Sequence, residues 1–276
     1  MDRARRAEAQ APRERKQDIS SRDPFYNVKL AVGRQGFSKI EGATVAFVGL
    51  GGIGSSLAPL LAGNGFRNFS FVDGDTVSER NVPLSSIFEL KHVGKPKVFA
   101  VRSVLEARFG RRLSIECHPS YSVDVPEEVI KEPGLLVLSV DDRWTKLAIT
   151  NMRIQASKPY VHLGFLGWEA SYMLVIPHRT ACWACLFRPD ESERVEKLKR
   201  EGKCPEPEPN VPGAVTPGTI QRLIGFAANE IMKFLAGSQN LVQYCSFDAK
   251  THDQVVRFLG SSHFRPDPEC PICKRE

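Results

Sequence analysis

Four of the seven cysteines stand in two matched pairs, each with two residues between its members. The first pair is Cys182 and Cys185 (CWAC), and the second is Cys270 and Cys273 (CPIC). Two such pairs can supply four thiolates at the corners of a tetrahedron, which is the ligand set of a closed structural zinc site. Either pair alone could be a redox dithiol, but neither lies in the βαβ pattern of thioredoxin-like motifs. We therefore expect one structural Zn²⁺ that ties the carboxy-terminal part of the sequence to the middle of the chain.

A second set of residues could hold phosphate. Residues 45–55 (VAFVGLGGIGS) run from an apolar strand pattern into G-x-G-x-x-G, with its glycines at Gly49, Gly51 and Gly54. Glycine lets the backbone approach a phosphate closely, and the amino terminus of the following helix offers N–H groups and a favourable dipole. Asp73, nineteen residues after Gly54, ends the next strand, where a carboxylate can bind a ribose hydroxyl. The pattern predicts nucleotide binding rather than a tight turn without a ligand, and at this point both NAD and ATP remain open.

These residues need a scaffold in which several strands end at one edge. Residues 135–140 (LLVLSV) form a continuous apolar run, which is typical of a strand buried on both faces of a parallel sheet. Alternating strands and helices predict an α/β fold with a doubly wound, Rossmann-like, mostly parallel sheet. The predicted strands are 44–48, 69–72, 113–117, 135–140 and 160–165, and the predicted helices are 95–109, 143–156 and one beginning at Ser55.

The pattern changes from Trp168 onward, where an elaborated carboxy-terminal part is expected. Residues 188–216 are charged and then rich in proline, which indicates a long mobile loop. A helix is predicted beyond it at 218–235. Because no repeat or linker is visible, residues 23–276 are predicted to form one domain. The strands predicted in this part are 171–176, 241–247 and 254–258.

Half of the net charge of +6 lies in the first 22 residues, which hold seven Lys or Arg and four Asp or Glu. Their apolar content is too low to offset chain entropy, so residues 1–22 are predicted to be a disordered basic tail. The remaining +3 forms no concentrated basic stripe, which argues against nucleic-acid binding. There is no apolar run of about 18 residues and no apolar centre of a signal peptide, so a cytoplasmic protein without a membrane segment is expected.

Three further segments bear on the choice between NAD and ATP. They are residues 72–81 (VDGDTVSERN), 93–97 (VGKPK) and 139–142 (SVDD). Together with the glycine turn and both cysteine pairs, they resemble the ThiF/MoeB/HesA family, the bacterial relatives of ubiquitin-activating enzymes, in type and in order. The resemblance covers about residues 24–276, and the motifs are specific jointly rather than singly.

The resemblance implies a site for ATP and Mg²⁺. Asp73 would hold the ribose, while Asn81 and Lys97 would contact the phosphates. Asp142 would coordinate Mg²⁺ near the α-phosphate, with the adjacent Asp141 as the next candidate. Positive charge and a metal are needed because attack of a carboxylate on the α-phosphate joins two anions. The nucleotide-binding residues implied are Gly49, Gly51, Gly52, Gly54, Ser55, Asp73, Asp75, Lys97 and Asp141.

The sequence departs from the family at both arginine positions. After Asn81 the family usually carries an arginine that touches the triphosphate, and Leu84 stands in its place here. The family's second arginine is donated by the partner subunit from an early segment, which in this chain runs from Tyr26 to Lys29 without an arginine. Lys29 or Arg34 could substitute, as a point charge in one case and with a different reach in the other.

Cys204 lies in the proline-rich part of the long loop, in the region where ThiF-like members carry a reactive cysteine. A thiolate there could attack an acyl adenylate and form a covalent intermediate. Nearby basic residues would favour the thiolate, whereas nearby glutamates would oppose it. An exposed bystander cysteine is the alternative.

The resemblance implies a homodimeric adenylyltransferase that uses ATP and Mg²⁺. The expected substrate is the carboxy terminus of a small ubiquitin-like or sulfur-carrier protein, and thiol transfer through Cys204 could follow. An alternative within the same chemistry is modification of a ribosomal peptide in natural-product biosynthesis, as in the microcin C enzyme MccB. Alternatives of another class are an NAD-dependent oxidoreductase, supported by the glycine turn and Asp73 alone, and a non-catalytic nucleotide-binding scaffold, which the lost arginine would permit.

Overall fold

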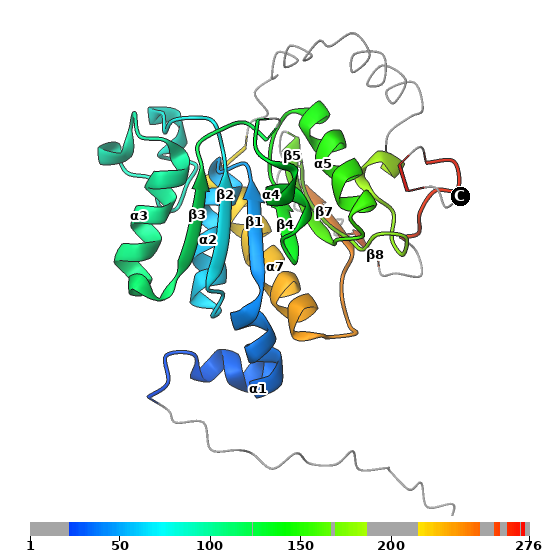
Figure 1. The fold of residues 1–276 in the computed structure, drawn as a ribbon, viewed down its shortest axis with the longest axis horizontal. Helices are drawn as coiled ribbons and strands as arrows, with labels where there is room; N and C mark the ends of the chain where they lie inside the picture. Colours follow the sequence, from blue (N-terminus) through cyan, green and yellow to red (C-terminus); the bar gives the residue numbers. More distant parts are fainter. Residues whose placement is uncertain are drawn as a thin grey trace, which may run out of the picture.

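The apolar runs of the sequence become the central strands of one eight-stranded sheet in the described part of the chain. The computed structural model describes residues 22–122, 124–166, 169–186, 215–248, 257–259, 264–270 and 272–273. The strand order is β3-β2-β1-β4-β5-β6-β7-β8 (Figure 1). The strands are β1 (Thr44–Val48), β2 (Asn68–Val72), β3 (Ser114–His118), β4 (Leu135–Leu138), β5 (Tyr160–Leu166), β6 (Glu169–Val175), β7 (Tyr244–Asp248) and β8 (Arg257–Leu259).

The five strands from β3 to β5 are parallel, and their order brings the expected site residues to one edge. The chain moves outward from β1 to β2 and β3, and then returns to β4 on the other side of β1. The carboxyl ends of β1 and β4 therefore lie side by side where the strand order reverses, which is where open α/β sheets bind ligands. The predicted doubly wound, mostly parallel sheet is confirmed.

The elaborated carboxy-terminal part extends the same sheet. β6 pairs antiparallel with β5, β7 with β6, and β8 with β7. This part of the chain also carries two cysteine-bearing segments, one after β6 and one after β8. The part from Trp168 onward thus adds a second, antiparallel half to the sheet, as the change of sequence pattern indicated.

Helices cover both faces of the sheet and enclose two hydrophobic cores. Alternate strand residues such as Phe47 and Phe71 point into the first core, beneath α1, α2, α3 and α7. The residues between them, such as Val48 and Val72, belong to the second core with α4, α5 and the cysteine-bearing segments. The helices are α1 (Tyr26–Gly42), α2 (Gly52–Gly63), α3 (Lys97–Phe109), α4 (Glu127–Lys131), α5 (Arg143–Gln155) and α7 (Pro217–Ala236), with short 3₁₀ turns η1 (Glu79–Asn81), η2 (Leu90–His92), η3 (Gly110–Arg112) and η4 (Trp183–Leu186).

Some elements differ from the sequence prediction. α1 was not predicted, because Gly33 interrupts its helical pattern with φ +72° and only three of its residues are buried. α2 begins at Gly52 instead of Ser55, because glycines of the turn form its first turn despite their low helix propensity. α4, only five residues long, was also not predicted. Most of the predicted tail (1–22) and of the predicted long loop, including Cys204, lies outside the described residues.

None of the helices in the described ranges has the length and apolar character that crossing a membrane requires.

Candidate functional site

The glycine turn follows β1, and its glycines play different physical parts. Gly49 has φ +94°, and a Cβ there would lie 2.7 Å from the carbonyl oxygen of Ser139. A Cβ at Gly54 would lie 2.1 Å from the carbonyl oxygen of Gly49. These two glycines are therefore required for packing. A Cβ at Gly51 would meet nothing within 4 Å, so Gly51 marks the open side of the turn, where a phosphate could approach.

Asp73 ends β2 and fixes the shape of the neighbouring turns. Its Oδ2 accepts a hydrogen bond from the Leu50 N–H at 2.6 Å, and its Oδ1 accepts one from the Asp75 N–H at 2.9 Å. The side chain is 8% exposed. Burial raises the pKa of Asp73, against the opposing effects of Lys97 and of the two N–H donors. Its position beside the glycine turn is compatible with the predicted contact to a ribose.

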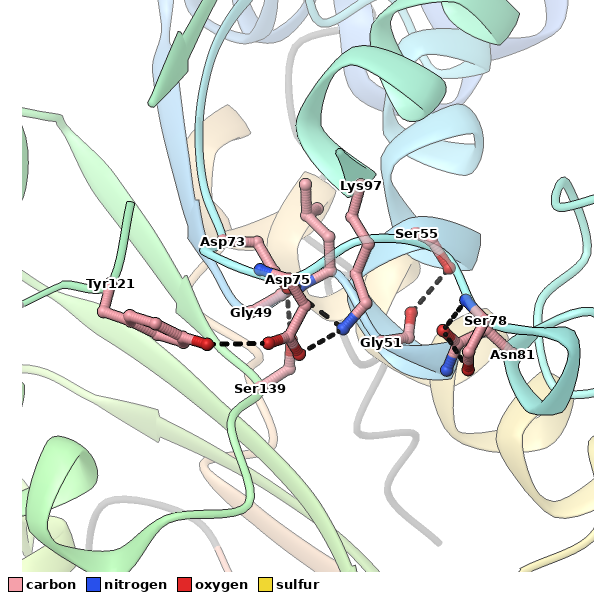
Figure 2. A network of polar contacts seen from close by, with 11 residues as sticks. Gly49, Gly51, Ser55, Asp73, Asp75, Ser78, Asn81, Lys97, Tyr121 and Ser139 are labelled. Atoms are coloured by element: carbon pink, nitrogen blue, oxygen red, sulfur yellow. Dashed lines mark hydrogen bonds and ion pairs between the residues drawn. The ribbon is translucent and has the colours of Figure 1, made fainter. Parts of the chain in front are cut away.

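Lys97 is the first residue of α3, two residues after the predicted start of this helix, and is buried between two carboxylates (Figure 2). Its Nζ lies 2.7 Å from Oδ2 of Asp75 and 3.6 Å from Oδ1 of Asp73. Burial tends to raise the pKa of Asp75, but the hydrogen bond and charge of Lys97 outweigh it, and the net shift is downward. Lys97 is thus a buried lysine at the edge of the sheet, positioned by two carboxylates, and not a solvated surface lysine.

Tyr121 is a residue of this network that the sequence did not reveal. Its hydroxyl donates to Oδ1 of Asp75 at 3.1 Å, across 46 residues of chain (Figure 2). Its ring fills the space left by Gly74, where a Cβ would lie 2.9 Å from ring atoms. Tyr121 belongs to no motif, so only the fold shows that it orients Asp75 and, through it, Lys97.

Asn81 and Ser55 are both engaged within their own turns. Oδ1 of Asn81 accepts from the N–H and the hydroxyl of Ser78, at 2.9 Å and 3.0 Å, which leaves its amide nitrogen to reach a ligand (Figure 2). The hydroxyl of Ser55 donates to the carbonyl oxygen of Gly51 at 2.5 Å. It also lies 2.8 Å from the hydroxyl of Ser85. Ser55 therefore supports the turn from within.

The two arginine positions of the family are filled differently here. Leu84 packs on the first core, and its carbonyl oxygen would lie 3.0 Å from a Cβ at Gly52. An apolar side chain thus stands where the family carries a cation. Lys29 and Arg34 belong to α1, which leads into the amino end of β1, away from the glycine turn (Figure 1). Lys29 is paired with Asp23 in the same chain.

Asp141 and Asp142 follow β4 at the same edge of the sheet. Ser139, just before them, donates through its hydroxyl to the carbonyl oxygen of Gly49 at 2.9 Å and so ties the two loops together. Asp142 caps α5, because its Oδ2 accepts from the Thr145 N–H at 2.5 Å. The other oxygen of Asp142 and the carboxylate of Asp141 are the kind of ligand that Mg²⁺ prefers beside a phosphate.

The four cysteines of the two pairs converge in the second core. The Sγ–Sγ distances are 3.8 Å for Cys182–Cys185, 3.7 Å for Cys182–Cys270 and 3.3 Å for Cys185–Cys273. Zinc with four thiolates at ~2.3 Å would place the sulfurs about 3.8 Å apart. Hydrogen bonding within the cluster, first from Cys182, lowers the pKa of Cys185 to about 7 and favours a thiolate there. The donor set and its spacing are compatible with zinc, and the predicted meeting of the two pairs is confirmed.

Comparison with known proteins decides the family. Residues 26–272 match the ThiF family. The chain belongs to the ThiF family. This confirms the resemblance, and it decides against an NAD-dependent dehydrogenase as the explanation of the glycine turn.

The curated relatives of this ThiF-family chain are longer proteins. "Adenylyltransferase and sulfurtransferase MOCS3" of Xenopus laevis is 26% identical over 207 residues, which cover 75% of this chain and 43% of that protein. The Bos taurus protein of the same name is 28% identical over 252 residues, which cover 88% of this chain and 50% of that protein. The chain therefore spans about half the length of these relatives.

Solved structures share the fold of the ThiF-family chain. The crystal structure of E. coli MccB with MccA-N7isoASN superposes with a TM-score of 0.73 and covers 94% of this chain and 76% of that one. The sequence identity is 16%, so this likeness concerns the fold alone.

Proposed function

We propose that the chain binds ATP and adenylates the carboxy-terminal carboxylate of a small ubiquitin-like or sulfur-carrier protein. The observation that carries this proposal is the arrangement at the carboxyl edge of the sheet. The glycine turn is open at Gly51, Lys97 is held beside it, and Asp142 follows the adjacent strand. Membership of the ThiF family supports it, because relatives are named adenylyltransferases and, in Dictyostelium discoideum, "SUMO-activating enzyme subunit 2".

In the proposed reaction a carboxylate oxygen of the substrate forms a bond to the α-phosphorus of ATP. The bond between that phosphorus and the oxygen leading to the β-phosphate breaks, and pyrophosphate leaves with the electron pair. The N–H groups in the first turn of α2 and the ammonium of Lys97 would bind the phosphates. Asp142 would hold Mg²⁺, with Asp141 as the next candidate, and the ion neutralises phosphate charge when it is bound.

The test is pyrophosphate exchange into ATP, stimulated by a carrier protein that ends in Gly-Gly. Asp142→Asn should abolish the exchange because it removes a charged metal ligand, whereas its amide oxygen can still cap α5 and keep the fold. Asp141→Asn is the matched control and should retain exchange. Full turnover in Asp142→Asn with loss in Asp141→Asn would mean that Asp141 holds the metal. Tight NADH binding without ATP binding would overturn the proposal.

The same chemistry on a ribosomal peptide is the second candidate, and the fold likeness to MccB favours it. Exchange stimulated by a short peptide precursor, but not by any carrier that ends in Gly-Gly, would select this alternative. ATP binding without exchange in the presence of either substrate would indicate a non-catalytic scaffold.

A second step through Cys204 is proposed from its place in the sequence. Its thiolate sulfur would form a bond to the acyl carbon of the adenylate, and AMP would leave with the electron pair of the broken C–O bond. Cys204→Ala should then retain pyrophosphate exchange and lose any thiol-labile adduct with the acceptor. Full product formation by this variant would show that Cys204 is a bystander. Loss of both steps would mean that the loop around it helps to build the adenylation site.

A structural zinc at the four cysteines completes the proposal. A homodimer stays a prediction from the family resemblance, and a cytoplasmic location stays a prediction from the apolar pattern of the sequence. Light scattering on the purified protein would test the first, and imaging of a tagged chain in its own cell would test the second.

A further inference from the structure

An ammonium without a carboxylate partner among the described residues lies four residues after Asp142. Lys146 belongs to α5 and is only partly exposed. Within the described ranges, no carboxylate is close enough to its Nζ to form an ion pair. Burial lowers the pKa of Lys146, and the more distant charges of Asp141 and Asp142 oppose this effect. A partly buried cation of this kind can bind an anion that the described residues do not supply.

The neighbouring strand β5 places an unpartnered imidazole close to Lys146. His162 is 5% exposed, and its Nε2 has no hydrogen-bond partner among the described residues. Burial and the charge of Lys146 lower the pKa of His162 to about 3, so the ring is neutral. Both side chains meet Trp183, whose ring lies 6.0 Å from the imidazole, centroid to centroid, and 5.8 Å from the Nζ of Lys146. Because buried polar atoms are almost always paired, an orphaned Nε2 calls for a ligand.

Gly164 lies against the edge of this buried imidazole. A Cβ at Gly164 would lie 3.2 Å from Cε1 and 3.7 Å from Nε2 of His162, and 3.9 Å from Oγ of Ser171. Gly164 and Ser171 are directly opposite each other in the β5–β6 pair, and His162 is two residues before Gly164. All three therefore share the face of the sheet that α5 covers. Nε2 of His162 and Oγ of Ser171 thus lie on the sheet face that α5 covers, and Nζ of Lys146 belongs to α5, the helix that Asp142 caps.

The charge at the carboxyl edge explains why a second cation is needed. Four aspartates gather there, and Lys97 is already shared between Asp73 and Asp75. A substrate carboxylate that approaches the α-phosphate would come close to these carboxylates, and Leu84 stands at the family's arginine position. Lys146 is the ammonium nearest in sequence to Asp142, and it is not committed to a carboxylate of the described residues. The aspartates of this edge are Asp73, Asp75, Asp141 and Asp142.

We propose that Lys146, His162 and Ser171 form the subsite for the terminal residue of the acyl substrate. Lys146 binds the terminal carboxylate, and Nε2 of His162 and the hydroxyl of Ser171 hydrogen-bond the polar backbone of the terminal residue. This inference rests on the proposed adenylation and adds to it the residues that select a free carboxyl terminus. The carboxylate is thereby held next to Asp142, on the side from which it can reach the α-phosphate.

The experiment measures binding of a short synthetic peptide that ends in Gly-Gly. The peptide is used as the free acid and as the carboxy-terminal amide. The full chain is saturated with a non-hydrolysable ATP analogue. The wild-type protein should bind the acid about tenfold more tightly than the amide, because a charge-assisted contact is present only with the acid. Lys146→Met, which keeps the apolar stem, should lose this preference and leave the affinity for the ATP analogue unchanged. Lys146→Arg should recover part of the preference.

Lys158→Met is the matched control, because Lys158 lies beyond the other end of α5. This variant should bind the acid and the amide as the wild type does. That result would show that the loss in Lys146→Met is not a general effect of removing a positive charge. If Lys146→Met does not fold, Gly164→Ala provides the second variant. Its methyl group would take space beside Nε2 of His162 and Oγ of Ser171 and should weaken binding of the acid and the amide alike.

Two results would overturn the subsite: equal affinity of the wild-type protein for the acid and the amide, or an undiminished preference in Lys146→Met. Both measurements are made without turnover, so they are independent of pyrophosphate exchange. Exchange in the wild type together with either result would leave the adenylation proposal standing and remove only the subsite. A preference for the acid without exchange would contradict the adenylation proposal instead.

Discussion

Lys97 illustrates how much of a site residue's state depends on residues remote in sequence. The G-x-P-K segment is enough to single out Lys97, but the structure adds that two aspartates already share its ammonium. An incoming phosphate therefore has to compete with carboxylates for Lys97, which makes the orientation of those carboxylates important. Asp75 is half exposed, and its orientation depends on the hydroxyl of Tyr121.

Tyr121→Phe tests this dependence. The variant keeps the ring that fills the space at Gly74 but frees Asp75 to rotate, so Lys97 loses its fixed position. We expect ATP affinity to fall about two- to fivefold, corresponding to about 0.5–1 kcal/mol for a hydrogen bond at an exposed site. Calorimetry with ATP measures the effect. Phe99→Leu, at an exposed aromatic residue of the same α3 helix, is the control and should bind ATP normally. Unchanged ATP affinity in Tyr121→Phe would show that the hydroxyl is not needed to position Lys97.

The sequence identified the candidate residues that lie in local motifs. Asp73, Lys97, Asp142 and the paired cysteines are recognisable because each stands in a short run of residues whose types and spacing mark it. Tyr121 could not be found in this way, since its partner Asp75 lies 46 residues away and neither spacing nor residue type marks the contact. The same holds for Lys146 and His162, whose common neighbour Trp183 lies on a third element.

At the scale of elements, the turn between β1 and α2 divides its glycines by function. Gly49 and Gly54 are needed because the backbone of the turn passes too close to Ser139 and to itself for any side chain. Gly51 has φ −67° and ψ −157°, values that other residues can adopt, and the space around its missing Cβ is open. Packing therefore does not explain the glycine at 51, whereas a ligand would.

A pair of substitutions separates these two reasons for glycine. Gly51→Ala should fold normally and bind ATP much more weakly, because its methyl group takes the space of the approaching phosphate. Gly54→Ala should lower the free energy of unfolding by about 1–3 kcal/mol, as expected for overpacking against a fixed backbone. Denaturant unfolding and ATP calorimetry on both variants make the comparison. Normal ATP affinity in Gly51→Ala would show that the phosphates approach elsewhere.

Helices and strands were predictable where their buried residues follow a simple sequence pattern. The parallel strands were found to within two residues at each end because fully buried strands read as continuous apolar runs, as in β4. Helix α1 was missed because its pattern is broken at Gly33, and its packing against α7 depends on a contact between distant parts of the chain. The start of α2 was misplaced because the glycines that signal a ligand are also poor helix formers.

At the scale of the whole molecule, the cysteine cluster joins segments that are 88 residues apart. Its two halves follow β6 and β8, so the cluster closes the antiparallel half of the sheet. It belongs to the second core, which also contains α5 and Trp183, whereas α2 and α7 belong to the first. The proposed zinc site therefore stabilises the layer that carries Asp142 and the proposed acyl subsite, on the side of the sheet opposite α2.

Removal of the metal should lower the stability of the protein. Freshly purified protein is expected to contain one Zn²⁺ per chain by elemental analysis, and a chelator should lower the melting temperature, because four close thiolates repel one another without a cation. Added Zn²⁺ should restore it. Acidification should release the metal, since zinc binding requires thiolates and protonation competes with it. Cys117→Ser is the matched control, because Cys117 lies in β3 away from the cluster, and this variant should keep the full zinc content. Protein that is purified without metal, and whose melting temperature a chelator leaves unchanged, would contradict a structural zinc site and leave the four cysteines as a thiol cluster within the second core.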